Sequence, residues 1–217
     1  MKSKTLKCVI LGHKNLGESD KFVFLYNEEF GKIKAVAKGS RKITSKFMGH
    51  LETLNICDVS LYYGPRNIII TEISTIDAHK RLHRNLEKLS GALQIAEITD
   101  QVLYENQTLE DLFRLIEKTL THLNDSKKPL LIAMSYIIKL LDKVGIIPEF
   151  KESLRVPEGT LRVLPEKYLK FLEFIRTRTF TEIETIALSK EENERIIDIL
   201  KSIIERETEK HFKSFLI

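Results

Sequence analysis

The sequence predicts an α+β protein in which a small five-stranded barrel, residues 1–78, precedes an all-helical domain, residues 79–217. Two observations lead to this prediction. Apolar residues alternate with a period of two in five short runs within the first eighty residues, which is the pattern of half-buried strands. After Asp77 the apolar residues recur every three or four positions, which is the period of a helix.

Five runs are expected to form strands, namely residues 6–11, 22–26, 32–38, 56–63 and 68–76. In the third run, KIKAVAK, one face holds Ile33, Ala35 and Ala37. The opposite face holds Lys32, Lys34, Val36 and Lys38. The second run, FVFLY, places three aromatic side chains on one face, and we expect them to pack in the barrel core, with a base-stacking platform as the alternative: Phe22, Phe24 and Tyr26. Five short strands without a long helix favour a closed barrel of the oligonucleotide-binding (OB) type.

The helical part begins with Asp77 as an expected N-cap, followed by an apolar stripe at Leu82, Leu86, Leu89, Leu93 and Ala96. A second helix is expected over residues 109–120. A third, apolar on most sides and therefore central, runs from Pro129 until Gly145 and Pro148 stop it. Residues 149–164 are expected to be irregular. Pro165 opens a fourth helix, and the capping box of Ser189 and Glu192 opens the last.

Composition limits the classes of protein that fit. No run of 18 apolar residues is present, so we expect no membrane span and an intracellular protein. The two cysteines, Cys8 and Cys57, fall in apolar runs and are expected to be buried free thiols. Residues 1–50 hold eleven cations and four acids, a net charge of +7, whereas the rest holds 24 cations and 27 acids, a net charge of −3. This asymmetry indicates a polyanionic partner, and a merely solvated basic surface is the alternative.

The third expected strand and the loop after it are the main candidate site. Lys32 and Lys34 are two residues apart on one strand face and therefore about 6.6 Å apart. Four further cations extend that face: Lys38, Arg41, Lys42 and Lys46. Such cations can bind phosphates without reading base sequence, and Phe47 could stack on a base. A second basic run, HKRLHR at residues 79–84, adds Lys80, Arg81 and Arg84.

Catalytic and metal motifs receive little support. The residues around Ser19, flanked by Glu18 and Asp20, lack a nucleophile elbow, and the sequence has no phosphate-binding glycine loop. His79 and His83 have the i, i+4 spacing of a chelating pair, but no further ligand lies near them in the sequence. We therefore expect no catalytic residue, metal or cofactor.

The first part of the chain contains a series of short motifs. They are the turn Gly17-Glu18-Ser19-Asp20, the hairpin end Gly31-Lys32, the segment Ala37-Lys38-Gly39-Ser40-Arg41-Lys42, and the pairs Lys46-Phe47 and Leu51-Glu52. Together these motifs resemble the RecO family of bacterial DNA repair proteins. Looser matches follow at residues 145–150 and 213–216. One departure is clear, because members of that family often carry four zinc-binding cysteines after the position of Phe150, whereas residues 151–168 contain none.

The resemblance implies a non-enzymatic recombination mediator that binds single- and double-stranded DNA and anneals complementary strands. It also implies that the protein engages the tail of the single-stranded DNA-binding protein and, with RecR, helps to load the RecA recombinase. The implied location is the bacterial cytoplasm, at the nucleoid. The residues expected to contact DNA are Lys32, Lys34, Lys38, Arg41, Lys42, Lys46, Phe47, Lys80, Arg81 and Arg84.

Three other hypotheses remain open from the residues alone. An RNA-binding OB module would use the same basic face. A metal-dependent nuclease would need carboxylates brought together from distant positions. A scaffold without nucleic-acid affinity would carry the cations as a solvated surface.

Overall fold

The computed structural model describes residues 3–146, 165–209 and 215. Contacts divide the chain into two compact units, which we call the barrel unit (residues 1–81 and 96–114) and the helical unit (residues 82–95 and 115–217). Residues 96–114 thus belong with the strands, although they follow the start of the helical sequence. The predicted domain boundary after residue 78 stays a prediction.

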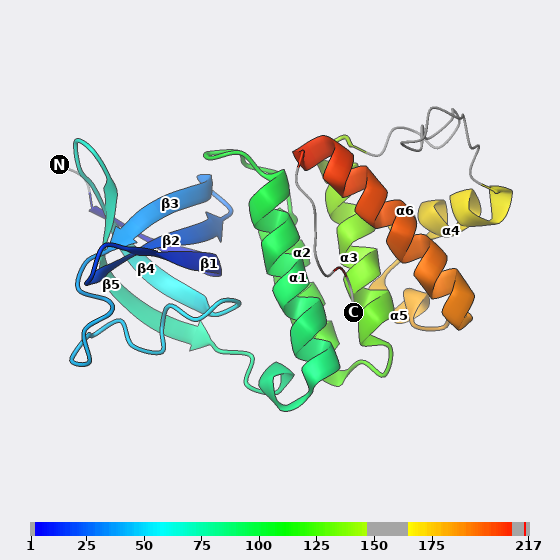
Figure 1. Cartoon of the computed structure of the whole chain (residues 1–217), viewed down its shortest axis with the longest axis horizontal. Helices are drawn as coiled ribbons and strands as arrows, with labels where there is room; N and C mark the ends of the chain where they lie inside the picture. Colours follow the sequence, from blue (N-terminus) through cyan, green and yellow to red (C-terminus); the bar gives the residue numbers. More distant parts are fainter. Residues whose placement is uncertain (1–2, 147–164, 210–214, 216–217) are drawn as a thin grey trace. The chain divides into compact units, whose positions relative to one another are not determined.

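Five strands, labelled in Figure 1, close into a barrel in the order β1-β2-β3-β5-β4. They are β1 Ser3–Leu16, β2 Asp20–Asn27, β3 Gly31–Ala37, β4 Ile56–Tyr63 and β5 Ile68–Asp77. Neighbouring strands pair antiparallel except β3 and β5, which pair in parallel. The predicted OB-like barrel is therefore confirmed.

The barrel interior is filled by the inward-facing side chains of each strand and by two residues of the loop after β3. On β3 the predicted inward face is confirmed, because Ile33, Ala35 and Ala37 are all buried in this core. On β2 the prediction is wrong, because the core contains Val23 and Leu25 rather than the aromatic face. The hairpin pairing explains this, since Leu25 lies opposite Ile33 and must share its face.

The two cysteines are buried free thiols, as predicted. Cys8 and Cys57 lie opposite each other on β1 and β4, and both belong to the barrel core. Burial raises the pKa of the Cys8 thiol to about 12, with the neighbouring Cys57 adding to the effect. Neutral thiols in this position pack as small apolar side chains.

The described residues after β5 form helices, namely η1 Leu82–Arg84, α1 Leu86–Val102, α2 Leu112–Asp125, α3 Pro129–Lys143, α4 Glu166–Thr177, α5 Phe180–Ile183 and α6 Lys190–Thr208. In the helical unit α3 packs against α4, α5 and α6, which confirms its predicted central place (Figure 1). Pro165 precedes α4 and the capping box of Ser189 and Glu192 opens α6, both as predicted. The short helix α5 was not predicted, although Thr179 and Glu182 form a capping box there too.

The start of the helical sequence differs from the prediction. Asp77 ends β5 instead of capping a helix, and its carboxylate accepts a hydrogen bond of 2.7 Å from the His79 backbone N–H. Of the expected stripe, Leu82 and Ala96 are buried, whereas Leu86 is 84% exposed and Leu93 is 42% exposed. Other apolar residues of α1 complete its buried face, among them Ala92, Ile95 and Ile98.

Pro148 and residues 149–164, for which an irregular segment was predicted, lie outside the described residues, and so does most of the segment without zinc-binding cysteines. Within the described ranges, no helix has both the length and the apolar character that crossing a membrane requires.

Candidate nucleic-acid interface

The basic loop, residues 38–55, connects β3 to β4 and is fastened to the turn between β1 and β2. The Gly39 N–H donates a 2.8 Å hydrogen bond to the Asp20 carboxylate. The Arg41 N–H donates to the Ser19 carbonyl at 3.0 Å, and the Arg41 guanidinium donates to the Gly17 carbonyl at 2.5 Å. Gly39 has a φ of +66°, which a residue without a side chain adopts at little cost. These contacts fix where the loop leaves the barrel.

Four of the predicted cations are exposed on this loop, as expected of phosphate ligands: Lys38, Arg41, Lys42 and Lys46. The Lys46 ammonium donates to the Thr71 carbonyl at 2.6 Å, which holds this end of the loop against β5. Lys34 is exposed on β3. Among the described residues, no carboxylate forms an ion pair with any of these five cations. The surface therefore presents positive charge that is available to an anion.

Lys32 does not belong to this surface. It is 9% exposed, and its ammonium lies 2.9 Å from the Asp100 carboxylate and donates to the Leu103 carbonyl at 3.1 Å. Residues 96–114 cover this end of β3, so the outward face predicted for Lys32 is not open to solvent. The prediction that Lys32 contacts phosphate is corrected, because the ammonium is already satisfied inside the barrel unit.

The prediction that Phe47 stacks on a base is also corrected. Its side chain is 5% exposed and belongs to the barrel core together with Leu51. A ring buried in this way cannot stack on a base, and it instead returns the loop to the barrel interior.

The outer face of β1, β2 and β3 carries two phenylalanines for which a stacking platform was the alternative prediction, together with Lys14, which the sequence reasoning missed. Phe22 and Phe24 are half-buried there, outside the barrel core. The Lys34 ammonium lies 4.4 Å from the centre of the Phe22 ring, and the Lys14 ammonium lies 5.7 Å from that of Phe24. Cations and aromatic rings thus alternate on neighbouring strands. The β2–β3 face is the usual ligand-binding face of OB folds.

The second basic run lies after β5. Lys80 and Arg81 are exposed in the barrel unit, whereas Arg84 is exposed in η1 of the helical unit. Their predicted contact with DNA stays a prediction.

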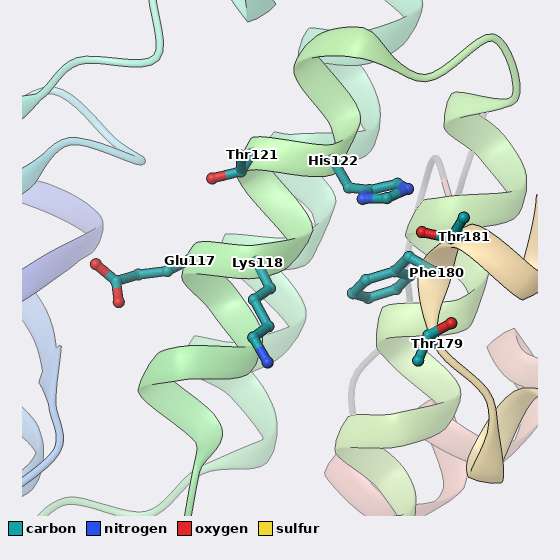
Figure 2. Close-up of a pocket in the computed structure, with 7 residues that line it drawn as sticks. All are labelled: Glu117, Lys118, Thr121, His122, Thr179, Phe180 and Thr181. Atoms are coloured by element: carbon teal, nitrogen blue, oxygen red, sulfur yellow. The ribbon is translucent and has the colours of Figure 1, made fainter.

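The helical unit contains a pocket of about 510 Å³ between α2 and the start of α5. Figure 2 shows the rings of His122 and Phe180 side by side, with their centres 5.6 Å apart, while Glu117 points away from them. The His122 Nε2 atom is 3.4 Å from the Glu184 carboxylate. These contacts join α2 to the segment around α5.

Within the described ranges, no group of three or more His, Cys, Asp or Glu side chains is arranged to hold a metal ion. The two cysteines of the sequence are both in the barrel core, so they do not fit a zinc site made of four cysteines.

Comparison with known proteins places both parts of the chain in one family. Residues 1–80 match the family model described as "Recombination protein O N terminal", and residues 83–158 match "Recombination protein O C terminal". The first match covers the five strands, and the second begins at η1.

Curated relatives agree with these matches. The chain is 25% identical to the DNA repair protein RecO of a Thermoanaerobacter species over 96% of its own length and 94% of the relative's. It is 32% identical to that of Dehalococcoides mccartyi over 67% of its length and 58% of the relative's, and 30% identical to that of a Roseiflexus species over 67% and 51%. In these last two, the chain aligns with little more than half of the relative. Two matching models from one family and a relative aligned along nearly its whole length show that the chain belongs to the RecO family of DNA repair proteins.

Proposed function

We propose that the protein is a non-enzymatic recombination mediator whose barrel unit binds single- and double-stranded DNA. The observation that carries the proposal is a group of exposed cations on β3 and the basic loop with no acidic partner among the described ion pairs: Lys34, Lys38, Arg41, Lys42 and Lys46. Cations of this kind displace the counterions of a phosphate backbone, which favours binding irrespective of base sequence. Lys80, Arg81 and Arg84 are proposed to add phosphate contacts.

Annealing of complementary strands follows from the same surface. Two strands repel each other through their phosphates, and cations that bind both strands reduce that repulsion. Contacts with phosphates leave the base edges free to pair. The surface would therefore raise the rate of annealing without selecting a sequence.

The family membership supports the partner part of the proposal. We propose that the protein engages the tail of the single-stranded DNA-binding protein and acts with RecR to load RecA, in the bacterial cytoplasm at the nucleoid. Coprecipitation of the full chain with each purified partner, with and without DNA, tests each contact separately.

The DNA-binding part is tested by measuring single-strand affinity against salt concentration. The best variant is Lys34→Gln/Lys38→Gln/Lys42→Gln, because Arg41 and Lys46 also hold the loop through backbone carbonyls. For single strands, each lost phosphate contact lowers the slope of log affinity against log salt by about 0.7. Three lost contacts should therefore lower it by about 2.

The matched control removes the same charge from the helical unit: Lys127→Gln/Lys170→Gln/Lys190→Gln. Its salt slope should equal that of the parent protein. Equal slopes for both variants would remove the loop from the DNA site. A preference for RNA in competition would favour the RNA-binding alternative, and metal-dependent cutting of a labelled oligonucleotide would favour a nuclease.

A further inference from the structure

We infer that Phe22 and Phe24 form a stacking platform for two bases of an extended single strand, and that this platform makes the barrel unit prefer single-stranded over double-stranded nucleic acid. The inference rests on the proposed function, because the neighbouring cations must hold the phosphates. It adds a role for two rings that no comparison assigns.

Both rings are partly exposed, and each has one face against a lysine ammonium. Lys34 lies over Phe22 and Lys14 lies over Phe24, so a mobile side chain is what covers that face. Both contacts are diagonal, since Lys34 is paired across the sheet with Phe24, and Lys14 is paired with Phe22. Each ammonium can therefore leave its ring for a phosphate while staying beside the platform, because lysine has a long flexible stem.

Space beside Phe24 is open as well. Gly12 lies opposite Phe24 on β1, where β1 has a register shift between Ile10 and Gly12. A Cβ atom added to Gly12 would have no neighbour within 4 Å. The platform thus has no side chain at this flank that would keep a flat base from reaching the Phe24 ring.

The spacing of the rings favours an extended strand. Residues two apart on a strand are about 6.6 Å apart. Stacked bases in one strand of a DNA duplex rise by only about 3.4 Å. Consecutive bases of a duplex therefore cannot each reach a ring, and their faces are already covered by their neighbours. A single strand pulled out of its own stacking can place one base on each ring, irrespective of sequence.

The test compares an oligothymidine, an abasic oligonucleotide of the same length and a duplex. Alanine replacement of a stacking aromatic weakens single-strand binding by about fivefold or more per base. Phe22→Leu/Phe24→Leu keeps apolar bulk, and we expect it to weaken oligothymidine binding about tenfold. Binding of the abasic oligonucleotide and of the duplex should change less than twofold. Phe174→Leu is the matched control, because Phe174 is also half-buried, with the Arg178 guanidinium 5.6 Å from its ring, but lies in the helical unit.

A fluorescence measurement distinguishes a loss of base stacking from a loss of folding. The sequence contains no tryptophan, so Phe24→Trp introduces a single reporter at the platform. Stacked bases should quench its fluorescence on addition of oligothymidine, and the abasic oligonucleotide should not. The inference would be overturned if Phe22→Leu/Phe24→Leu lost equal affinity for oligothymidine and for the abasic oligonucleotide. It would also be overturned if a bound oligothymidine did not quench the fluorescence of the reporter. If the parent protein binds none of the three probes, the proposed function fails instead.

Discussion

Replacing Lys32 by Met separates a structural lysine from a phosphate ligand. The substitution keeps the aliphatic stem and removes the ammonium that pairs with Asp100 and bonds the Leu103 carbonyl. Breaking a buried ion pair by removing one partner costs about 3–5 kcal/mol, whereas an exposed pair contributes about 1 kcal/mol at most. The Lys32 side chain is 11% exposed but that of Asp100 is 26% exposed, so water solvates part of the carboxylate left behind. We therefore expect a loss of about 2–3 kcal/mol.

The loss of stability should be confined to the contacts between residues 103–109 and the barrel strands. The Asn106 N–H donates to the Lys32 carbonyl at 2.8 Å, and the Leu109 N–H donates to the Tyr26 hydroxyl at 3.1 Å. Hydrogen exchange of these two amides reports the opening of this segment. A loss of 2–3 kcal/mol corresponds to exchange that is faster by about thirtyfold to two-hundredfold.

A second substitution gives the control. Lys32→Met/Asp100→Leu replaces the pair by apolar side chains, which often restores stability because no unpaired charge remains buried. Single-strand affinity and its salt slope should equal those of the parent in both variants. A Lys32→Met protein with normal amide protection and a salt slope lowered by about 0.7 would refute this reasoning and return Lys32 to the DNA site.

Three further substitutions or treatments test the barrel unit. Gly31→Ala should cost more than about 2 kcal/mol in thermal or urea unfolding, because Gly31 has a φ of +68° and an added Cβ would lie 2.0 Å from the Gln107 carbonyl oxygen. Tyr26→Phe should cost about 1–3 kcal/mol in the same assay, since the hydroxyl bonds both the N–H and the carbonyl of Leu109. At pH 8 the Cys8 thiol should resist an alkylating reagent, as read by mass spectrometry, until urea unfolds the barrel. Because its folded pKa of about 12 is above the ordinary 9.0, the contribution of Cys8 to stability should be complete below pH 9 and decline between pH 9 and 12.

Local signals predicted most of the fold. The strict alternation of residues 32–38 predicted both the existence and the inward face of β3, and Pro129, Pro165 and Ser189 predicted where three helices begin. The exposure of the loop cations was also predictable, because a polar segment between two strands lies at the protein surface. Each of these features depends on neighbours within a few residues in the sequence.

The burial of a side chain by residues far away in the sequence could not be predicted from local patterns. Lys32 has the alternation of a surface lysine, and only the return of a segment 68 residues later buries it against Asp100. Phe47 follows a run of exposed cations, yet the loop turns back there and inserts the ring into the barrel. In both cases the predicted role was wrong because the residues that bury the side chain are absent from the local sequence.

The aromatic face of β2 was misassigned for a different reason, because the information was present in the sequence. Residues 22–26 are apolar on both faces, so alternation within β2 alone does not say which face is inside. The β2–β3 hairpin identifies the inward face, because the three residues 28–30 separate its paired ends Asn27 and Gly31. Counting back from that pair puts Leu25 opposite Ile33 and Phe24 opposite Lys34. The clear inward face of β3 therefore determines that of β2, and it leaves the two phenylalanines beside the cations on the outer face of the barrel.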